Sequence, residues 1–382
     1  MAEQDSVAII GAGLMGAASA WALARRGRPV TVFEQFPIGH KQGSSHGSAR
    51  IVRRGYSDTL YVELTGRAFD VWDELEAESG TSPLRMLGGL DFGPTRDVPG
   101  VARLLAEAGV EHEVLSAAEA AERWPGMKFD GDVVYHRQAG TVDADQAVHL
   151  LIDRARAAGA TVRPETRVTA VEPRGDGVTV RCADGTELTV SCAVVAAGGW
   201  AAGLLAGLVE LPPLTVTQEQ VFHFPRRDLS VPAWPSVIHE RDAAEGHAVY
   251  HLAGGRDGGP NDDRKIGIHF AGTVTTAADR DGRVSDAVRD EAVEYVRRWL
   301  PGLDPRPSSE ATCLYTSTAS QDFVLDRHGP LVICSPCSGH GAKFAPLIGE
   351  LVADLVTGGA PPPDRFRIAA HAGAPVGRPV SL

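Results

Sequence analysis

The sequence predicts an α/β protein in which a Rossmann-like domain is interleaved with a second, α+β domain built on an antiparallel sheet. Three observations indicate this. A strand–turn–helix–strand unit opens the chain, alternating strands fill the middle, and strand and helix patterns return near the C-terminus. A length of 382 residues also suggests about two domains. We expect one domain over 1–84, 141–214 and 311–382, and the other over 85–140 and 215–310.

The first elements form one βαβ unit. "SVAII" (6–10) is a short apolar run rich in β-branched residues and predicts a strand. "LMGAASAWALARRG" (14–27) has helical spacing and stops at a glycine, and "PVTVFE" (29–34) predicts the second strand. A glycine-rich turn between the first strand and the helix is typical of nucleotide-binding folds.

That turn carries the pattern G-x-G-x-x-G at Gly11, Gly13 and Gly16. The first glycine permits a tight turn, the second lets a pyrophosphate approach the backbone, and the third lets the helix pack close to the strand. Glu34 follows at the end of the second strand, where a carboxylate accepts both ribose hydroxyls. We expect Ala12, Met15 and Gln35 to complete the nucleotide site. The motif leaves FAD and NAD open.

Apolar periodicity predicts the later elements in turn. They are a helix over 60–78, strand-like residues over 85–93, a helix capped by Ser116 and Glu119, a helix and strand over 140–173, a hairpin turning at Asp184-Gly185, a buried strand over 192–201, strands over 220–225, 248–254 and 265–273, and a helix over 286–299. A last helix should have Pro346 in its first turn and Gly358 just past its end. The polar, glycine-rich residues 254–265 predict an exposed loop.

Composition narrows the classes of function. The 37 basic and 49 acidic residues give a formal net charge of −12, which argues against nucleic-acid binding. Five scattered cysteines do not resemble a disulfide framework, and no apolar run is long enough to span a membrane. No group of residues has metal-ligand spacing. We expect a cytoplasmic protein without a signal peptide, and a monomer, since nothing demands a partner.

The C-terminal segment "TCLYTSTASQDFVLDRHGPLVICSPCSGHGAKF" (312–344) resembles the covalent-flavin segment of the monomeric sarcosine oxidase and N-methyltryptophan oxidase family, a branch of the D-amino-acid-oxidase-like flavoproteins. "CLYT" (313–316) and "SGHGAKF" (338–344) match its two motifs. "GSSHGSARIVR" (43–53) and "KIGIHFAGT" (265–273) match in the same order, so the resemblance covers most of the chain.

The resemblance implies that the cofactor is FAD, attached through Cys313 as a thioether. A reactive thiolate needs positively charged surroundings. A helix beginning near Ala345 would face the negatively charged edge of the reduced flavin. The further cofactor-binding residues implied are Ser44, Ser45, Arg50, Val168, Ala197, Gly198, Trp200, Gly339, His340, Gly341 and Lys343.

The resemblance also implies catalytic roles. Arg53 and Lys343 would bind a substrate carboxylate, and Arg50 would lie against the flavin face. Arg50 and Arg53 are three residues apart, so that one helical turn or tight loop would aim both at one anion. Lys265 would activate O2 by stabilising the developing negative charge. His269 and Tyr250 would complete the pocket; His269 is expected to share a strand face with Lys265.

These residues predict an FAD-dependent oxidase of a secondary amine, either an N-methyl or a cyclic amino acid. A hydride would pass to FAD, the imine would be hydrolysed, and O2 would be reduced to H2O2. The alternative is a flavin-dependent dehydrogenase or tailoring enzyme that acts on a cyclic imino acid such as pipecolate; a flavin-binding subunit without its own turnover is a third. Ser45 and "YHLA" (250–253) depart from the family pattern, so the substrate need not be sarcosine.

Overall fold

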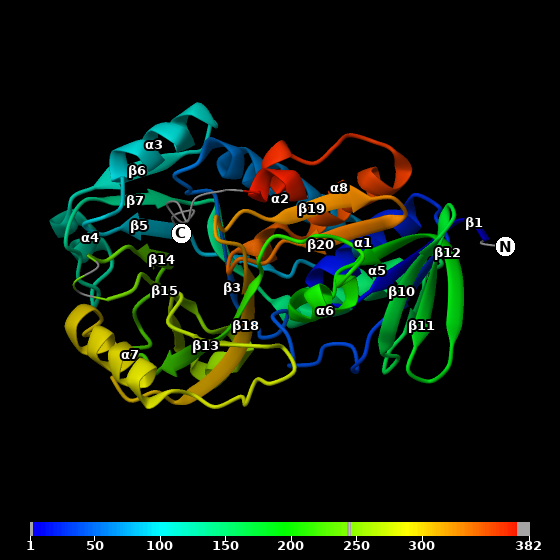
Figure 1. Cartoon of the computed structure of the whole chain (residues 1–382). Coiled ribbons are helices and arrows are strands. Elements are labelled where there is room, and N and C mark those ends of the chain that lie inside the picture. The colour runs from blue at the N-terminus through cyan, green and yellow to red at the C-terminus, as the bar shows by residue number, and fades with distance from the viewer. Residues whose placement is uncertain (1–2, 243, 245, 373–382) are drawn as a thin grey trace.

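A twisted, mainly parallel sheet forms one half of the protein (Figure 1). The computed structural model describes residues 3–242, 244 and 246–372; residues 1–2 and 373–382, which the sequence assigns to the first domain, lie outside the described residues. The strands of this sheet are β1 (Glu3–Ile10), β2 (Val30–Phe33), β9 (Thr161–Arg163), β10 (Val168–Arg174), β11 (Gly177–Cys182), β12 (Glu187–Val195), β19 (Val324–His328) and β20 (Leu331–Ser335). β20, β12, β1, β2 and β9 run parallel side by side, and β10, β11 and β19 join antiparallel. This is the predicted Rossmann-like arrangement.

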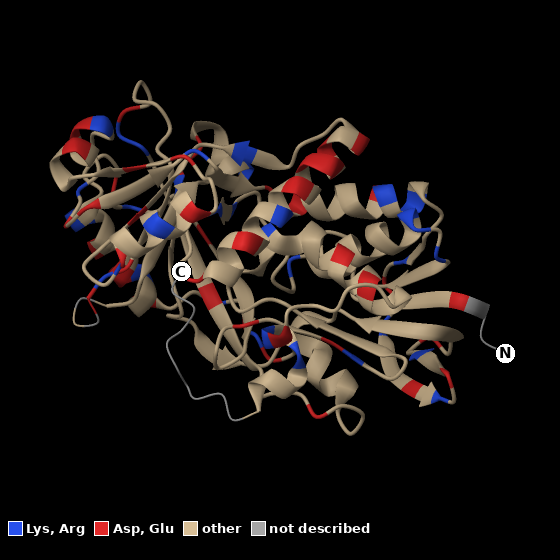
Figure 2. Cartoon of the chain, turned by 90° about the horizontal axis from the view of Figure 1, so that it is seen from above, with Lys and Arg blue, Asp and Glu red and all other residues tan. Residues whose placement is uncertain are grey.

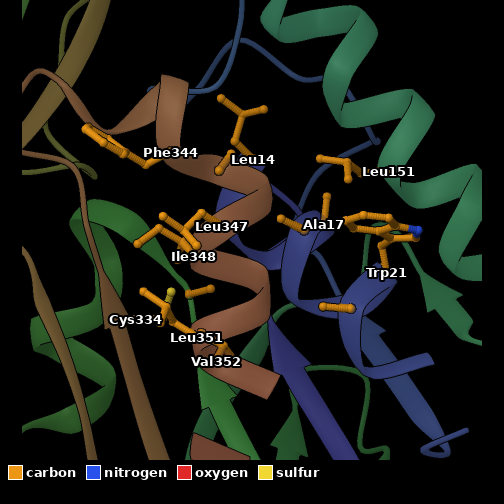
Figure 3. Packing of buried hydrophobic residues seen from close by; sticks show 14 of the residues in the cluster. Leu14, Ala17, Trp21, Leu151, Cys334, Phe344, Leu347, Ile348, Leu351 and Val352 are labelled. Atoms are coloured by element: carbon orange, nitrogen blue, oxygen red, sulfur yellow. The ribbon is translucent and has the colours of Figure 1, made fainter. Parts of the chain in front are cut away.

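Three helices cover one face of this sheet, α1 (Leu14–Arg25), α5 (Ala144–Ala157) and α8 (Ala345–Thr357), and α2 (Thr59–Ser79) packs against α8. Figure 3 shows α1 against α8, with Ala17 and Trp21 on one side and Leu347 and Ile348 on the other. The opposite face packs against α6 (Ala201–Leu205). Burial of these apolar faces joins the N- and C-terminal parts of the chain, which are more than 300 residues apart.

A nine-stranded sheet forms the other half. Its strands are β5 (Gly89–Phe92), β6 (His112–Leu115), β7 (Val133–His136), β13 (Thr215–Phe224), β14 (Ser236–His239), β15 (Val249–Ala253), β16 (Arg264–Ile268), β17 (Thr273–Thr275) and β18 (Ser309–Ser317). All pairs are antiparallel except β5 with β14. α3 (Val98–Glu107) and α4 (Ala117–Arg123) lie beside β6 and β7, and α7 (Asp286–Trp299) covers the outer face.

Successive side chains of a strand point to opposite faces of the sheet, and the two faces of this second sheet contact different surroundings. Phe222, Ile266 and Val249 point outward to α7 in the core, whereas their neighbours Val221 and Tyr250 point inward to a cavity between the sheets. A small sheet of β3 (Arg50–Arg53), β4 (Leu84–Met86) and β8 (Ala139–Val142) lies between the two halves.

Most predicted elements are present, including the capping box of Ser116 and Glu119 and the last helix, which Gly358 caps just past its end at Thr357. Four expectations need correction. The strand expected over 265–273, with Lys265 and His269 on one face, is interrupted: β16 ends at Ile268 and β17 begins at Thr273. The strand-like stretch 85–93 is split between β4 and β5, and the expected loop 254–265 contains the 3-10 turn η3 (Gly255–Asn261). Arg50 and Arg53 lie on a strand rather than on a helical turn or tight loop. The division into two domains stays a prediction, although β18 crosses its boundary at residue 311 by pairing with β13.

The surface carries charges of both signs. Figure 2 shows basic and acidic residues interspersed over the helices and loops of the face in view. Among the described residues, no helix has the combination of length and apolar character needed to cross a bilayer. All five cysteines are free thiols.

Candidate active site

A cavity of about 480 Å³ runs between the two sheets. One end lies at the glycine turn and Glu34, and the other lies at Arg53 and Lys343. The cavity wall includes most of the residues expected from sequence: Gly11, Ala12, Gly13, Met15, Glu34, Gln35, Ser44, Ser45, Arg50, Arg53, Val168, Ala197, Gly198, Trp200, Tyr250, His269, Cys313, Gly339, His340, Gly341 and Lys343. Gly16 and Lys265 lie behind this wall. Within the described residues, no cluster of His, Cys, Asp and Glu side chains has the arrangement of a metal site.

The glycine turn is built for close backbone contact. Gly11 has φ of +102°, and a Cβ there would lie 2.5 Å from the carbonyl oxygen of Ala196. A Cβ on Gly16 would lie 1.8 Å from the carbonyl oxygen of Gly11. The absence of a side chain at Gly16 therefore lets α1 lie close to β1, and Gly16 does not contact a ligand directly. Close packing of helix and strand is the role of the third glycine in a dinucleotide-binding turn.

Replacing Gly16 with alanine is therefore expected to push α1 away from β1, to lower the melting temperature and to remove most of the flavin that the family resemblance implies. The visible absorbance of the flavin relative to protein, together with thermal unfolding, measures both effects. Gly131→Ala is the matched control, because a Cβ there meets nothing within 4 Å. Normal flavin content and stability in Gly16→Ala would show that the close packing is dispensable.

Glu34 is held as a carboxylate at the end of β2. Its Oε2 accepts a hydrogen bond from the Ala12 N–H at 2.8 Å, and its Oε1 accepts one from the Phe36 N–H at 3.0 Å. His40 Nε2 lies 3.4 Å from Oε1. Burial opposes ionisation, but the hydrogen bonds from His40, Ala12 and Phe36 outweigh it and lower the pKa of Glu34. An ionised acceptor at this position suits the hydroxyl groups of a ribose.

The other end of the cavity contains a buried arginine with unused donors. Arg53 is 2% exposed, and its Nη1 donates to Asp91 Oδ1 at 3.4 Å. Its Nε and Nη2 have no hydrogen-bond partner among the described residues. The guanidinium also lies 4.2 Å from the centre of the Tyr56 ring. Buried donors without partners are costly, so this geometry favours an anionic ligand in the cavity.

Arg53 is positioned by a buried network of charges. Asp91 Oδ1 also accepts a hydrogen bond of 2.6 Å from Arg96, which in turn pairs with Glu240 at 2.6 Å. Asp91 is 1% exposed, so the two arginines keep its charge compensated. Sequence reasoning missed Asp91, because nothing in the spacing links it to Arg53.

Lys343 and Tyr56 complete this end. Lys343 Nζ donates to Tyr56 Oη at 2.9 Å and to the His340 carbonyl oxygen at 2.6 Å. Lys343 belongs to the 3-10 turn η4 (Gly341–Phe344), which precedes α8. The expected helix does begin at Ala345, but the helical turn that faces the cavity is η4. The first N–H groups of a helical turn have no partner within it and suit negative charge.

A second basic group lies around Ala49. Arg50 Nη1 and Lys265 Nζ both donate to its carbonyl oxygen, at 3.0 Å and 2.8 Å. Lys265 is 2% exposed, and burial, followed by the charge of Arg50, lowers its pKa to about 7. The expectation that Lys265 and His269 line the pocket together is therefore wrong for Lys265, which points to the backbone behind the wall. Arg50 and Arg53 are three residues apart on β3, so their side chains point to opposite faces of the sheet and contact different partners.

Cys313 lines the cavity beside these cations. It is 5% exposed and pairs with Glu219 in the register of β18 and β13. Burial raises the pKa of the Cys313 thiol, and Arg50 and Lys265 oppose this effect. Tyr315, two residues on, also lines the cavity and was missed, although the period of a strand places it on the same face as Cys313.

The wall around Tyr250 is uncharged. Leu252, Ile238 and Tyr250 provide apolar or neutral surfaces, and burial keeps His269 neutral by lowering its pKa to about 3. Within the residues that the structure describes, His269 Nδ1 has no hydrogen-bond partner. The apolar residues could not be identified from sequence, because any strand next to a core has similar ones.

The residues present fit FAD. The cavity joins a glycine turn and a ribose-type carboxylate at one end to backbone N–H groups, a buried thiol and cations at the other. Its path also passes Ala197, Gly198 and Trp200, which follow β12 at the carboxyl edge of the parallel sheet. Ligands of such sheets bind at that edge.

Comparisons with known proteins agree with this chemistry. The profile of the family described as "FAD dependent oxidoreductase" matches residues 6–355. The chain is 33% identical to monomeric sarcosine oxidase of Streptomyces avermitilis over 370 residues, covering 94% of this chain and 95% of that protein. It is 30% identical to N-methyl-L-tryptophan oxidase of Escherichia coli, covering 91% and 93%. The open form of NikD, described as an unusual amino acid oxidase essential for nikkomycin biosynthesis, superposes with a TM-score of 0.83 at 25% identity and covers 95% of this chain and 97% of that one.

Proposed function

Because the chain belongs to the family of FAD-dependent oxidoreductases, we propose that it oxidises a secondary amine that carries a carboxylate, either an N-methyl or a cyclic amino acid, and reduces O2 to H2O2. The observation that carries the proposal is Arg53, a buried guanidinium in the cavity wall with two donor nitrogens that have no partner in the described part of the chain. Sarcosine, an N-methyl-tryptophan, proline and pipecolate all present such a carboxylate. When bound, FAD would supply the redox chemistry, namely an acceptor for the substrate hydride and a route for the electrons to O2.

We assign a role to each residue of the cavity wall from its position. Arg53 and Lys343 bind the carboxylate and so fix the substrate in the cavity. Tyr250, Leu252 and neutral His269 surround the amine without offering a negative charge, which favours the neutral amine over the ammonium ion. Lys265, behind Ala49, supplies positive charge where O2 is reduced.

A panel of the four amino acids tests the proposal. Substrate-dependent peroxide release with one or more members is expected, at one peroxide per carbonyl product. Reduction of an artificial dye without peroxide would instead support the alternative, a dehydrogenase or tailoring enzyme acting on a cyclic imino acid such as pipecolate. The tailoring role within that alternative is kept because the fold is shared with NikD, which is described as an amino acid oxidase essential for nikkomycin biosynthesis.

We also propose that FAD is bound covalently through Cys313. The thiol faces the cavity, and the charges of Arg50 and Lys265 favour its thiolate. Acid precipitation of the wild-type protein should give a yellow pellet, whereas the Cys313→Ser variant should release its flavin into the supernatant. Cys337→Ser is the matched control, because Cys337 also lines the cavity, and this variant should retain the flavin in the pellet. Free FAD released from the wild type would contradict the thioether.

A further inference from the structure

Lys343 is buried in the cavity wall without an acidic partner. It is 4% exposed, and the atoms that accept hydrogen bonds from its Nζ, Tyr56 Oη and the His340 carbonyl oxygen, are both uncharged. Within the described residues, no carboxylate forms an ion pair with this lysine. A buried ammonium ion in such surroundings is unfavourable, and a buried amine relieves the cost by giving up its proton.

The titratable groups nearest to Lys343 come from several segments, and among the described residues none of these nearest groups is negative. Arg53 on β3 is a cation, and Tyr56 follows it in the next turn. His340 uses both ring nitrogens, with Tyr56 Oη at 3.1 Å and the Gln321 carbonyl oxygen at 3.1 Å. The last of these groups is His269, which follows β16 in the chain and is neutral. Burial, and then Arg53, lower the pKa of Lys343 well below its ordinary value.

We infer that a carboxylate enters this site together with one proton: Lys343 is a neutral amine in the free cavity and becomes an ammonium ion when the anion binds between it and Arg53. The inference rests on the proposed function, in which these two residues hold the substrate carboxylate. The incoming negative charge replaces the missing acidic partner and so stabilises the charged form of Lys343.

An amino-acid substrate brings this proton with it. A zwitterion has a carboxylate and an ammonium group, and the neutral Lys343 is available as the acceptor of the ammonium proton, directly or through water. One N–H bond of the substrate breaks, one N–H bond forms on Nζ, and no electrons change hands. The products are a neutral substrate amine and a Lys343 ammonium ion paired with the carboxylate. The neutral amine has the lone pair that hydride loss from the adjacent carbon requires, so the residue that binds the acid group also activates the amine.

Calorimetry of the FAD-containing enzyme tests the inference with a readout independent of turnover. The probe is 2-furoate, an acid without an oxidisable amine, titrated in phosphate and in Tris buffer at about pH 8. The two buffers have different heats of ionisation, so that the difference in binding heat counts the protons exchanged. We expect an uptake of about one proton per 2-furoate and a Kd that rises by up to about tenfold per pH unit above the lysine's free pKa.

Three variants test whether Lys343 is the group that takes up the proton. Lys343→Arg carries a permanent charge and should bind 2-furoate with no proton uptake. Lys343→Met should lose the uptake and bind more weakly. Lys265→Met is the matched control, since Lys265 is also buried but donates to Ala49, and it should keep the uptake of the wild type. A normal visible flavin spectrum in each variant shows that the protein is folded around its cofactor.

The outcomes distinguish a failure of this inference from a failure of the proposed carboxylate site. If 2-furoate binds to the wild type without proton uptake, the inference is wrong while the carboxylate site stands. Uptake that persists in Lys343→Arg would mean that another group, such as His269, takes the proton, and it would also overturn the inference. If neither 2-furoate, acetate nor benzoate binds, the carboxylate site itself is wrong and the inference falls with it.

Discussion

Replacing Arg53 with methionine is expected to lower kcat/KM for the amino-acid substrate by about a thousandfold. Two hydrogen bonds between the guanidinium and a carboxylate contribute roughly 4 kcal/mol, and each 1.4 kcal/mol corresponds to about tenfold. The effect should fall mainly on KM and on the rate of anaerobic flavin reduction, which both depend on how the substrate is held. Steady-state kinetics and stopped-flow absorbance measure the two quantities.

The structure supplies a matched control for this prediction. Arg54 is the next residue, and its guanidinium bonds Thr65 and Gln138 outside the cavity wall. Arg54→Met should therefore have near wild-type kcat/KM. Arg53→Met should still fold, because Asp91 keeps its 2.6 Å contact with Arg96. Equal losses in the two variants, or an unchanged kcat/KM in Arg53→Met with normal flavin content, would contradict the role of Arg53.

Replacing Lys265 with methionine is expected to slow the reaction of the reduced enzyme with O2 by about 10²–10³-fold, which is typical of removing one electrostatic stabiliser. Anaerobic reduction by the substrate should change little, because Lys265 lies behind Ala49 rather than in the substrate cavity. Stopped-flow measurement of both half-reactions checks this, and Lys265→Arg should restore part of the rate. Equal slowing of the two half-reactions would remove the specific role of Lys265 towards O2.

The pH dependence gives an independent check on Lys265. Its pKa is lowered to about 7, chiefly by burial, so that the ammonium charge is present below this pH and is lost as pH rises through it. The rate of reaction with O2 in the wild type should therefore fall as pH rises through the pKa of the lysine. Lys265→Met has no such group, and its rate should lack this transition.

Local patterns in the sequence predicted the nucleotide end of the site. Gly11, Gly13 and Glu34 are linked by spacing alone, because a strand, a tight turn and a helix have fixed geometry. The Rossmann-like half was predictable for the same reason. The motif at 313–316 also placed Cys313 beside the cofactor cavity, and a strict application of strand alternation would have added Tyr315.

Contacts between distant segments could not be predicted in this way. Asp91 supports Arg53 from the second sheet, and Lys265 turns to the Ala49 carbonyl instead of the cavity, because β16 passes next to the segment before β3. No periodicity within either segment encodes that crossing. The parallel pairing of β5 with β14 is a similar case, since the chain between them is more than 100 residues long.

A crystal structure of the FAD-containing enzyme with 2-furoate tests the central claim most directly, namely that distant parts of the chain converge to hold an acid group over a flavin. The account predicts the carboxylate within hydrogen-bond distance of both the Arg53 guanidinium and Lys343 Nζ, beside the flavin ring. A carboxylate bound away from these two side chains, or a cavity that holds a cofactor other than FAD, would contradict it.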